Sequence, residues 1–277
     1  LITSAAASDT GIISKLIPTN NISASAAYET ISSGDWEFGI NYRNKVELKR
    51  YTGSDSVIYI PDSITDPNTN QTYKIDCLSS SLFMDCKDRI TEVYFPSGID
   101  TIIGEILKDA TNLSYVSIPN GVKYICVGAF ENTPNLKSIT FPDTLEEIFA
   151  RVFKKSGLTS VTFPSSLRFI RDNAFSGTKI TTVTLPHTLQ TVGDYVFSEC
   201  EELRHATIRC SDTGYSIFGE NEKIVNVNIS TDCLNGVLSS GALAGCPNLT
   251  KISNIDVLCY DEDGKPCIDS RLAPYIR

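Results

Sequence analysis

The 277-residue sequence contains no apolar run near the roughly 20 residues that a membrane-spanning helix needs. It also has no cluster of basic residues, because its 24 Lys and Arg are scattered among 33 Asp and Glu and the formal net charge is −9. A protein that binds nucleic acid needs clustered Lys and Arg to replace the counterions of the phosphates. The sequence therefore predicts no nucleic-acid partner and no membrane insertion by this segment.

The motifs of the common enzyme classes are missing as well. There is no G-x-S-x-G, H-E-x-x-H or G-x-x-x-x-G-K, and the two histidines, His187 and His205, lie at different positions of the repeat described below. No C-x-x-C pair occurs among the nine cysteines, which argues against a zinc ribbon. We therefore expect no enzyme activity, no catalytic or metal-binding residue and no cofactor, with both histidines at the surface.

What the sequence does contain is a repeat, marked by two independent residue types. Prolines recur every 22 or 23 residues, at Pro96, Pro119, Pro142, Pro164 and Pro186. A large apolar residue closes each unit at nearly the same period, at Phe83, Leu107, Phe130, Phe153, Phe175, Phe197, Phe218 and Leu243. Two markers with one shared period predict a solenoid, in which each unit buries its apolar face against its neighbours.

Within one unit, the residue pattern predicts how the chain runs. Residues 158–163, "LTSVTF", alternate apolar and polar side chains as a short strand does, and Pro164 ends that strand because it lacks an N–H group. Leu167 and Ile170 return the chain in an extended or single-turn segment, and Phe175 closes the unit. We therefore expect one parallel strand per unit and a buried spine of closing residues.

The pattern of Leu136, Ile139, Phe141, Pro142, Leu145, Ile148 and Phe153, together with "GAF" at 128–130, "NAF" at 173–175 and "FSEC" at 197–200, resembles the BspA-like, Treponema-type class of leucine-rich repeats. The resemblance covers about residues 75 to 250, with departures at Leu107, at "IRC" (208–210) and over residues 211–232. It implies a curved, β-rich α/β solenoid with parallel strands on its concave face and hairpin caps.

The chain is expected to have four parts. Residues 1–33 are a tail or linker with one short helix near Ala24–Ile31, and residues 34–76 form a cap of antiparallel hairpins broken by "YTGSD" and "DPNTN". Residues 77–250 hold repeats of about 22–24 residues, and residues 251–277 form a second cap, with a hairpin that turns at "DEDG". Because 35 residues separate Pro61 from Pro96, that step is expected to be one unit with a hairpin insertion.

The cysteines fall into two groups. Cys86, Cys200 and Cys246 each follow a closing residue by three positions, where a buried cysteine packs as a small apolar side chain. Cys259 and Cys267 flank the expected terminal turn. A disulfide across that hairpin is a second hypothesis, and it would imply an oxidising compartment.

The solvent-facing positions of the predicted strands are the candidate binding surface. They are Glu92, Tyr94, Tyr115, Ser117, Ser138, Thr140, Ser160, Thr162, Thr182, Thr184, His205 and Thr207. One interpretation needs no partner, because β-branched Thr suits an exposed strand. The other is a concave, uncharged, hydrogen-bonding surface for a protein or glycan, with Tyr94 and Tyr115 as aromatic anchors.

The leading functional hypothesis is a non-enzymatic binding module, secreted or on a cell surface. Adhesion to proteins or glycans on host or neighbouring cells is what the resemblance implies. A second hypothesis is a recognition or scaffold fragment of a larger surface protein. A third is a hydrolase that uses Ser or Cys on the concave face.

Overall fold

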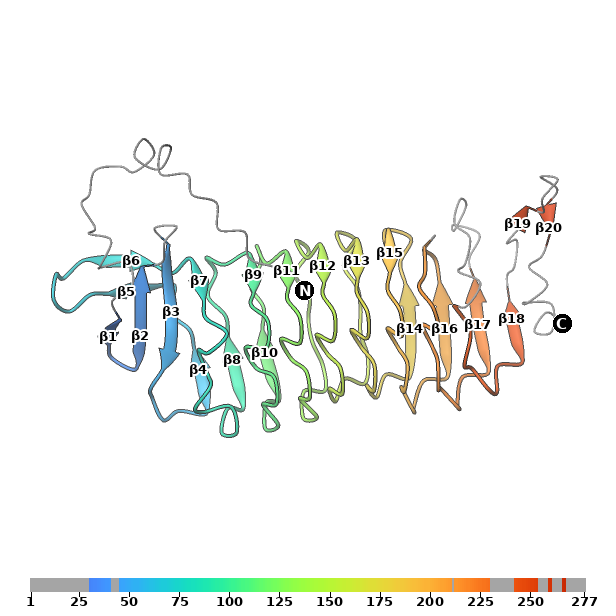
Figure 1. The fold of residues 1–277 in the computed structure, drawn as a ribbon, viewed down its shortest axis with the longest axis horizontal. Coiled ribbons are helices and arrows are strands. Elements are labelled where there is room, and N and C mark those ends of the chain that lie inside the picture. Colours follow the sequence, from blue (N-terminus) through green and yellow to red (C-terminus); the bar gives the residue numbers. More distant parts are fainter. Residues whose placement is uncertain are drawn as a thin grey trace, which may run out of the picture.

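The computed structural model describes residues 30–40, 45–210, 212–229 and 242–253, and the backbone of residues 259–260 and 266–267. Its units follow one another in a row and form an elongated β-solenoid (Figure 1). The solenoid prediction is confirmed. The α/β class is wrong, since the described residues form strands and turns and contain no helix. Each return segment is too short for a helix and is extended instead.

Two series of parallel strands run along the solenoid. The first contains the strands that carry the candidate surface: β4 (Val57–Tyr59), β8 (Glu92–Tyr94), β10 (Tyr115–Ser117), β14 (Thr182–Leu185), β16 (His205–Ile208), β17 (Asn226–Ile229) and β18 (Lys251–Ser253). We call this side the ladder face. It consists of two sheets, ordered β10-β8-β4 and β14-β16-β17-β18.

The second series, the return sheet, is continuous. Its order is β15-β13-β12-β11-β9, with β9 (Thr101–Ile102), β11 (Tyr124–Ile125), β12 (Glu147–Ile148), β13 (Phe169–Ile170) and β15 (Thr191–Val192). These strands are the segments that return the chain after each proline. Units that contribute to both series therefore hold two short strands, and the expectation of a single strand per unit is wrong.

The closing residues form the expected spine behind both series. Phe83, Leu107, Phe130, Phe153, Phe175, Phe197 and Phe218 are fully buried, and Leu243 is 7 % exposed. Successive rings stack from Phe130 to Phe218, with centroid distances of 5.4, 5.3, 5.2 and 5.9 Å. This continuous aromatic column confirms the predicted spine.

From Leu107 to Phe218, the turns on either side of each spine residue use left-handed backbone. Around Phe175, Asn173 has a φ of 57° and Gly177 a φ of 70°. Glycine adopts this conformation without strain, and asparagine adopts it more readily than most residues. The same two positions are left-handed in other units, at Glu105, Asp109, Gly128, Asn132, Arg151, Lys155, Tyr195, Glu199, Ser216, Glu220 and Gly245. These paired turns place the spine residue inside the unit from Leu107 to Phe218.

The first repeats are covered by an antiparallel sheet of β1 (Ile31–Ser33), β2 (Trp36–Ile40) and β3 (Val46–Tyr51). β3 also pairs in parallel with β7 (Cys77–Leu78), which joins this sheet to the first repeats. Ile31 lies in β1, so the short helix expected to reach it does not, and residues 24–29 lie outside the described residues. "YTGSD" does not turn a hairpin, since β4, which follows it, pairs in parallel with β8.

The long first unit carries a hairpin insertion, as predicted. β4 pairs with β8 so that Tyr59 lies beside Tyr94, 35 residues later. Between the two, β5 (Ser63–Thr65) and β6 (Thr72–Lys74) form an antiparallel hairpin that contains "DPNTN". The amide of Ser97 donates a hydrogen bond of 2.6 Å to Oδ1 of Asp62, which ties the start of the insertion to the next unit.

The last third of the repeats is more regular than the sequence indicated. Strand β17 lies within residues 211–232, the stretch that fits the repeat poorly, and it pairs in register with β16 and β18. At the end, β19 (Cys259–Tyr260) and β20 (Pro266–Cys267) form an antiparallel pair that sets Cys259 opposite Cys267. Their side chains lie outside the described residues, so the disulfide stays a prediction.

Candidate functional site

None of the twelve predicted surface residues is buried, and all lie on the ladder face. Eight belong to strands, and their partners are their equivalents in the next repeat. Thr182 lies beside His205, and Thr184 lies beside Thr207. Ser138, Thr140, Ser160 and Thr162 lie instead in segments 137–141 and 159–163, which are outside any strand. The structure therefore brings the predicted residues together in two paired groups with an unpaired stretch between them.

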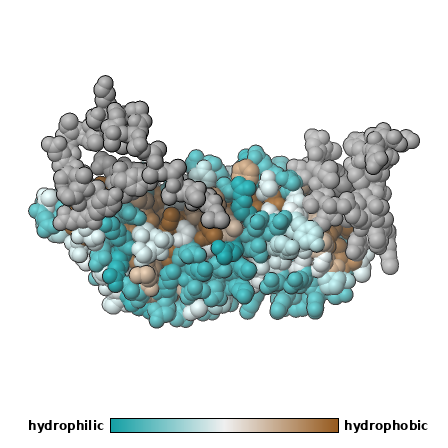
Figure 2. Space-filling view, in the orientation of Figure 1, coloured by the Kyte–Doolittle hydropathy of each residue, from teal (hydrophilic) through white to brown (hydrophobic). Residues whose placement is uncertain are grey.

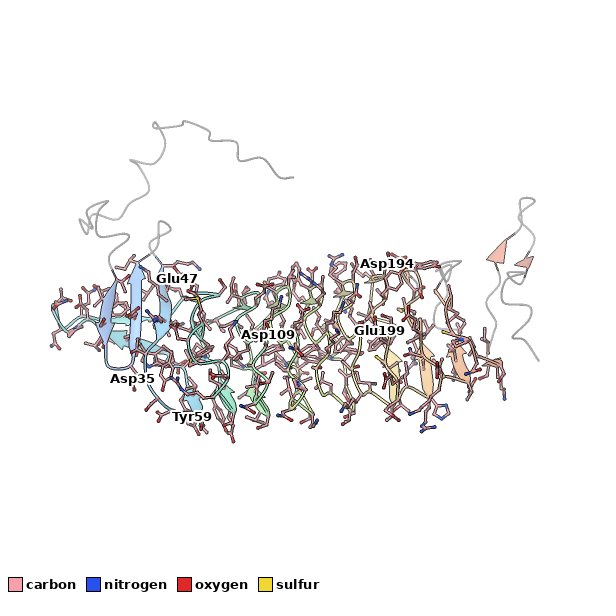
Figure 3. All side chains as sticks on the ribbon, turned by 60° about the horizontal axis from the view of Figure 1, so that its bottom comes forward. Asp35, Glu47, Tyr59, Asp109, Asp194 and Glu199 are labelled. Carbon is pink, nitrogen blue, oxygen red and sulfur yellow. The ribbon has the colours of Figure 1, made fainter. Side chains whose placement is uncertain are left out.

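Three tyrosines cluster at the N-terminal end of the ladder face. The rings of Tyr59 and Tyr94 stack with centroids 4.4 Å apart, and Tyr115 packs against Tyr94 at 5.4 Å. The hydroxyl of Tyr94 donates a 2.9 Å hydrogen bond to the Glu92 carboxylate. That bond raises the pKa of Tyr94 to about 12. Tyr59 is 67 % exposed and lies at the margin of the molecule in Figure 3. Tyr115 is 46 % exposed.

Sequence reasoning missed several residues of this face. Tyr59 was missed although the 35-residue step that relates Pro61 to Pro96 also relates Tyr59 to Tyr94. At the other end the face continues through β17 and β18, whose outward side chains are Asn226, Asn228, Lys251 and Ser253. No proline follows β17 or β18, so the periodic marker that ends most of the other strands was missing there.

The two ladder sheets are separated by a stretch where the strands do not pair. Strand β10 is hydrogen-bonded to β8 on one side, and on its other side segment 137–141 forms no strand with it. Further along, the Thr159 amide still donates to the Lys137 carbonyl at 3.1 Å, and the Thr181 amide donates to the Thr159 carbonyl at 3.3 Å. These bonds lie at the start of each segment, so the segments diverge beyond them.

Apolar side chains that are buried elsewhere reach the surface at this interruption. Val183, Ala206 and Val227 are at most 4 % exposed, whereas Ile139 and Val161, at the same repeat position, are half-buried. The last apolar position of each segment differs less uniformly: Ile118 and Phe163 are half-buried and Phe141 is 8 % exposed, while their equivalents Leu185, Ile208 and Ile229 are fully buried. The interruption therefore exposes part of the core on the ladder face.

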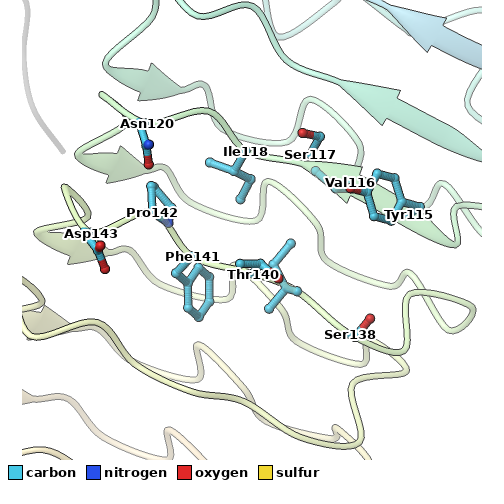
Figure 4. A pocket seen from close by; sticks show the side chains of 11 residues that line it. Tyr115, Val116, Ser117, Ile118, Asn120, Ser138, Thr140, Phe141, Pro142 and Asp143 are labelled. Carbon is cyan, nitrogen blue, oxygen red and sulfur yellow. The ribbon is translucent and has the colours of Figure 1, made fainter.

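A groove of about 480 Å³ opens at the first step of the interruption. One wall is formed by Tyr115, Val116, Ser117, Ile118 and Asn120, and the other by Ser138 to Asp143. Figure 4 shows β10 on one side and the Ser138–Phe141 segment facing it, with Ile118 and Phe141 at its apolar part. In Figure 2, apolar side chains reach the surface left of the centre of the molecule, with hydrophilic side chains below them.

Comparison with known proteins identifies the repeat. A model of the BspA-type leucine-rich repeat region matches residues 62–159 and 146–257, in six copies. The chain belongs to the BspA-type leucine-rich repeat family. Among curated proteins, none matches the chain.

Two solved structures of this kind resemble the chain. A leucine-rich repeat protein of T. pallidum is 22 % identical, with a TM-score of 0.61 over 71 % of this chain and 91 % of that one. A leucine-rich cell surface protein of Faecalibacterium prausnitzii is 18 % identical, with a TM-score of 0.54 over 83 % of this chain and 89 % of that one. At these identities the likeness shows the fold alone.

The cysteines of the BspA-type repeat serve packing, as expected. Cys86, Cys200 and Cys246 are buried, and each thiol lies within hydrogen-bonding distance of a spine carbonyl: 3.6 Å to Phe83, 3.3 Å to Phe175 and 3.2 Å to Phe218. Other units fill the same buried position with Ala110, Thr133, Ser156, Thr178 and Asn221. Burial raises the pKa of Cys200 to about 11 and of Cys246 to about 12, so neither thiol ionises at neutral pH.

The histidines and the acidic side chains were the other candidates for chemistry. His187 and His205 are both exposed, as expected. Over residues 30–40, 45–210, 212–229 and 242–253, no group of three or more His, Cys, Asp or Glu side chains is placed to hold a metal ion. The same part of the BspA-type chain contains no helix long and apolar enough to cross a membrane.

Proposed function

We propose that this chain is a non-enzymatic binding module, secreted or displayed on a cell surface, that holds a protein or glycan of a host or neighbouring cell against its ladder face. The supporting observation is the tyrosine cluster on a face where uncharged hydroxyl side chains recur from unit to unit. The Faecalibacterium relative is described as a cell surface protein, which supports the same location for this chain.

The tyrosine cluster is suited to anchor a partner. Aromatic side chains supply large contact areas and dominate the binding energy of many interfaces. The Tyr94 ring is already fixed between Tyr59 and Tyr115 and by its hydrogen bond to Glu92, so little rotamer freedom is lost when a partner binds. The ladder hydroxyls beyond it can donate and accept hydrogen bonds without a charge to desolvate.

The test is a double variant, Tyr94→Ala with Tyr115→Ala, measured for binding to extracellular-matrix coatings and to cells. We expect binding to weaken by about 1–2 kcal/mol or more, because both anchors are lost. Tyr195→Ala with Tyr215→Ala is the matched control, since these rings are 40 % and 50 % exposed and contact each other at 5.8 Å outside the ladder strands. Unchanged binding by the first variant, with loss in the control, would contradict the proposal.

A further inference from the structure

The tyrosine cluster contains the one carboxylate among the outward side chains of the described ladder strands, that of Glu92. In the register of the first sheet, Glu92 of β8 lies between Val57 of β4 and Tyr115 of β10. Tyr94 follows two residues later, on the same face of the strand, and Tyr59 lies beside it. The negative charge therefore sits on the sheet between aromatic side chains.

This carboxylate has no cationic partner within the described part of the chain. One oxygen, Oε2, accepts the 2.9 Å hydrogen bond from the Tyr94 hydroxyl, and Glu92 takes part in none of the ion pairs there. The basic side chains that precede it in the sequence bind elsewhere: Arg89 donates to the Gly53 carbonyl, and Lys87 donates to the Glu105 carbonyl at 3.0 Å. The half-buried Glu92 can therefore accept a cation from outside without losing an existing ion pair.

The rings around Glu92 favour the same kind of ligand. Tyr59 and Tyr94 stack with their planes 12° apart, so one face of the Tyr59 ring is covered and the other is turned toward the edge of the sheet, where β4 is the last strand. The Tyr115 ring is inclined by 47° to that of Tyr94 and lies on the strand beside Glu92. The face of an aromatic ring carries negative charge density and attracts cations, so carboxylate and rings act together.

We propose that this cluster binds an arginine side chain of a partner polypeptide, with the guanidinium group hydrogen-bonded to Glu92 and its plane against the ring of Tyr115. The proposal rests on the proposed function and names the partner as a basic stretch of protein. Guanidinium is planar and always charged, matches a carboxylate with two N–H groups and stacks on aromatic rings. The net charge of −9 would also attract a basic partner, whereas Glu92 would repel an acidic glycan.

The experiment titrates the full chain with the blocked tripeptide acetyl-Gly-Arg-Gly-amide and follows the tyrosine ring resonances by NMR. The same tripeptide with citrulline in place of arginine is the control, because citrulline has nearly the same shape and no charge. We expect the arginine peptide to shift the Tyr94 and Tyr115 resonances at millimolar concentration and the citrulline peptide to bind at least ~10-fold more weakly. The lysine peptide should also bind more weakly, because a compact ammonium group neither stacks nor donates as a fork.

A charge variant locates the binding site. Glu92→Gln removes the negative charge, while the amide oxygen of glutamine can still accept the hydrogen bond from the Tyr94 hydroxyl. Glu201→Gln changes the net charge equally at an exposed position outside the ladder strands and is the matched control. We expect Glu92→Gln to bind the arginine and citrulline peptides alike and Glu201→Gln to bind as the unchanged chain does. The comparison of the two peptides on the unchanged chain holds whether or not a variant folds.

Three results would overturn the proposal: no shift of the ring resonances by the arginine peptide, equal binding of the citrulline or lysine peptide, or arginine binding that a folded Glu92→Gln leaves unchanged. Shifts of the same resonances by the neutral trisaccharide maltotriose, without shifts by the arginine peptide, would assign the cluster to a glycan instead.

The proposed function fails separately from the arginine site. If Tyr94→Ala with Tyr115→Ala leaves adhesion intact while Glu92→Gln loses the arginine peptide, the arginine site stands and the adhesive role of the ladder face does not. If the tyrosine variant loses adhesion while the unchanged chain binds the arginine and citrulline peptides equally, the adhesive role stands and the arginine site does not.

Discussion

The two halves of the ladder face share a repeat but differ in how they are held together. From β14 to β18 the four strands pair in register and their inward side chains are buried. From β10 to segment 159–163, the open half, the chain has the same spine, and the return strands β11, β12 and β13 pair behind it, yet most ladder bonds are missing. The difference shows that the spine and the return sheet hold the units in a stack even where the ladder bonds are missing.

The two halves also differ in side-chain size at one repeat position. The closed sheet has Leu185, Ile208 and Ile229 at the end of its strands, whereas the open half has two consecutive phenylalanines, Phe141 and Phe163. Their rings stack with centroids 6.3 Å apart. Each ring also packs on a spine ring, Phe141 on Phe153 at 5.8 Å and Phe163 on Phe175 at 5.6 Å.

The largest loss of stability is expected from a substitution in the spine, which both halves of the ladder face share. Phe175 is fully buried between the rings of Phe153 and Phe197, at the border of the open and closed halves. Phe175→Ala should lower the free energy of unfolding by about 3–5 kcal/mol, because it removes a buried ring and leaves a cavity. Chemical denaturation measures this loss, and a midpoint that barely moves would show that the spine does not hold the halves together.

Two proline substitutions at the same repeat position should differ in their cost to stability between the closed and the open half. Thr207 and Thr140 occupy the same repeat position, but β16 is paired on both sides and segment 137–141 is not. Thr207→Pro should cost about 2–4 kcal/mol, since it breaks a ladder bond and leaves a carbonyl without its donor. Thr140→Pro should change the free energy of unfolding by less than about 1 kcal/mol. Equal losses in urea denaturation would mean that both positions are paired in solution.

A smaller difference in stability is expected between two valine-to-alanine substitutions at the same repeat position. Val227 is fully buried in the closed sheet, and Val161 is half-buried in the open half. Val227→Ala should cost about 2 kcal/mol, because two methyl groups leave the core, and Val161→Ala should cost less than about 1 kcal/mol. The same denaturation experiment measures both, and a larger loss at Val161 would mean that the open half is closed in solution.

The periodic residues made much of the fold predictable. Phe175 and Pro164 recur with a fixed step, and a residue that must be buried or must end a strand in every unit is visible in one sequence. The absence of helix in the return segments could not be predicted in this way. The return strand Phe169–Ile170 has only two residues, and so short a segment has no periodicity that distinguishes an extended backbone from a helical turn. The outward ladder residues were found because they alternate with buried ones.

The interruption of the ladder could not be predicted from the same pattern. Residues 158–163, "LTSVTF", and residues 180–185, "ITTVTL", have the same alternation and differ mainly in the final Phe or Leu. Whether two strands pair depends on the distance between their backbones, which is set by how two units pack against each other. The groove therefore depends on how two adjacent units pack, and the sequence of a single unit does not reveal it.

Residue-resolved amide hydrogen exchange on the full chain tests the central claim most directly. The amides of Ile118 and Thr140 point into the open groove, whereas the amide of Thr207 lies in a strand paired on both sides. We expect Thr207 to exchange slowly and Ile118 and Thr140 to exchange near the rates of an unprotected chain. Protection of Thr140 equal to that of Thr207 would show that the ladder face is closed throughout and would contradict the account.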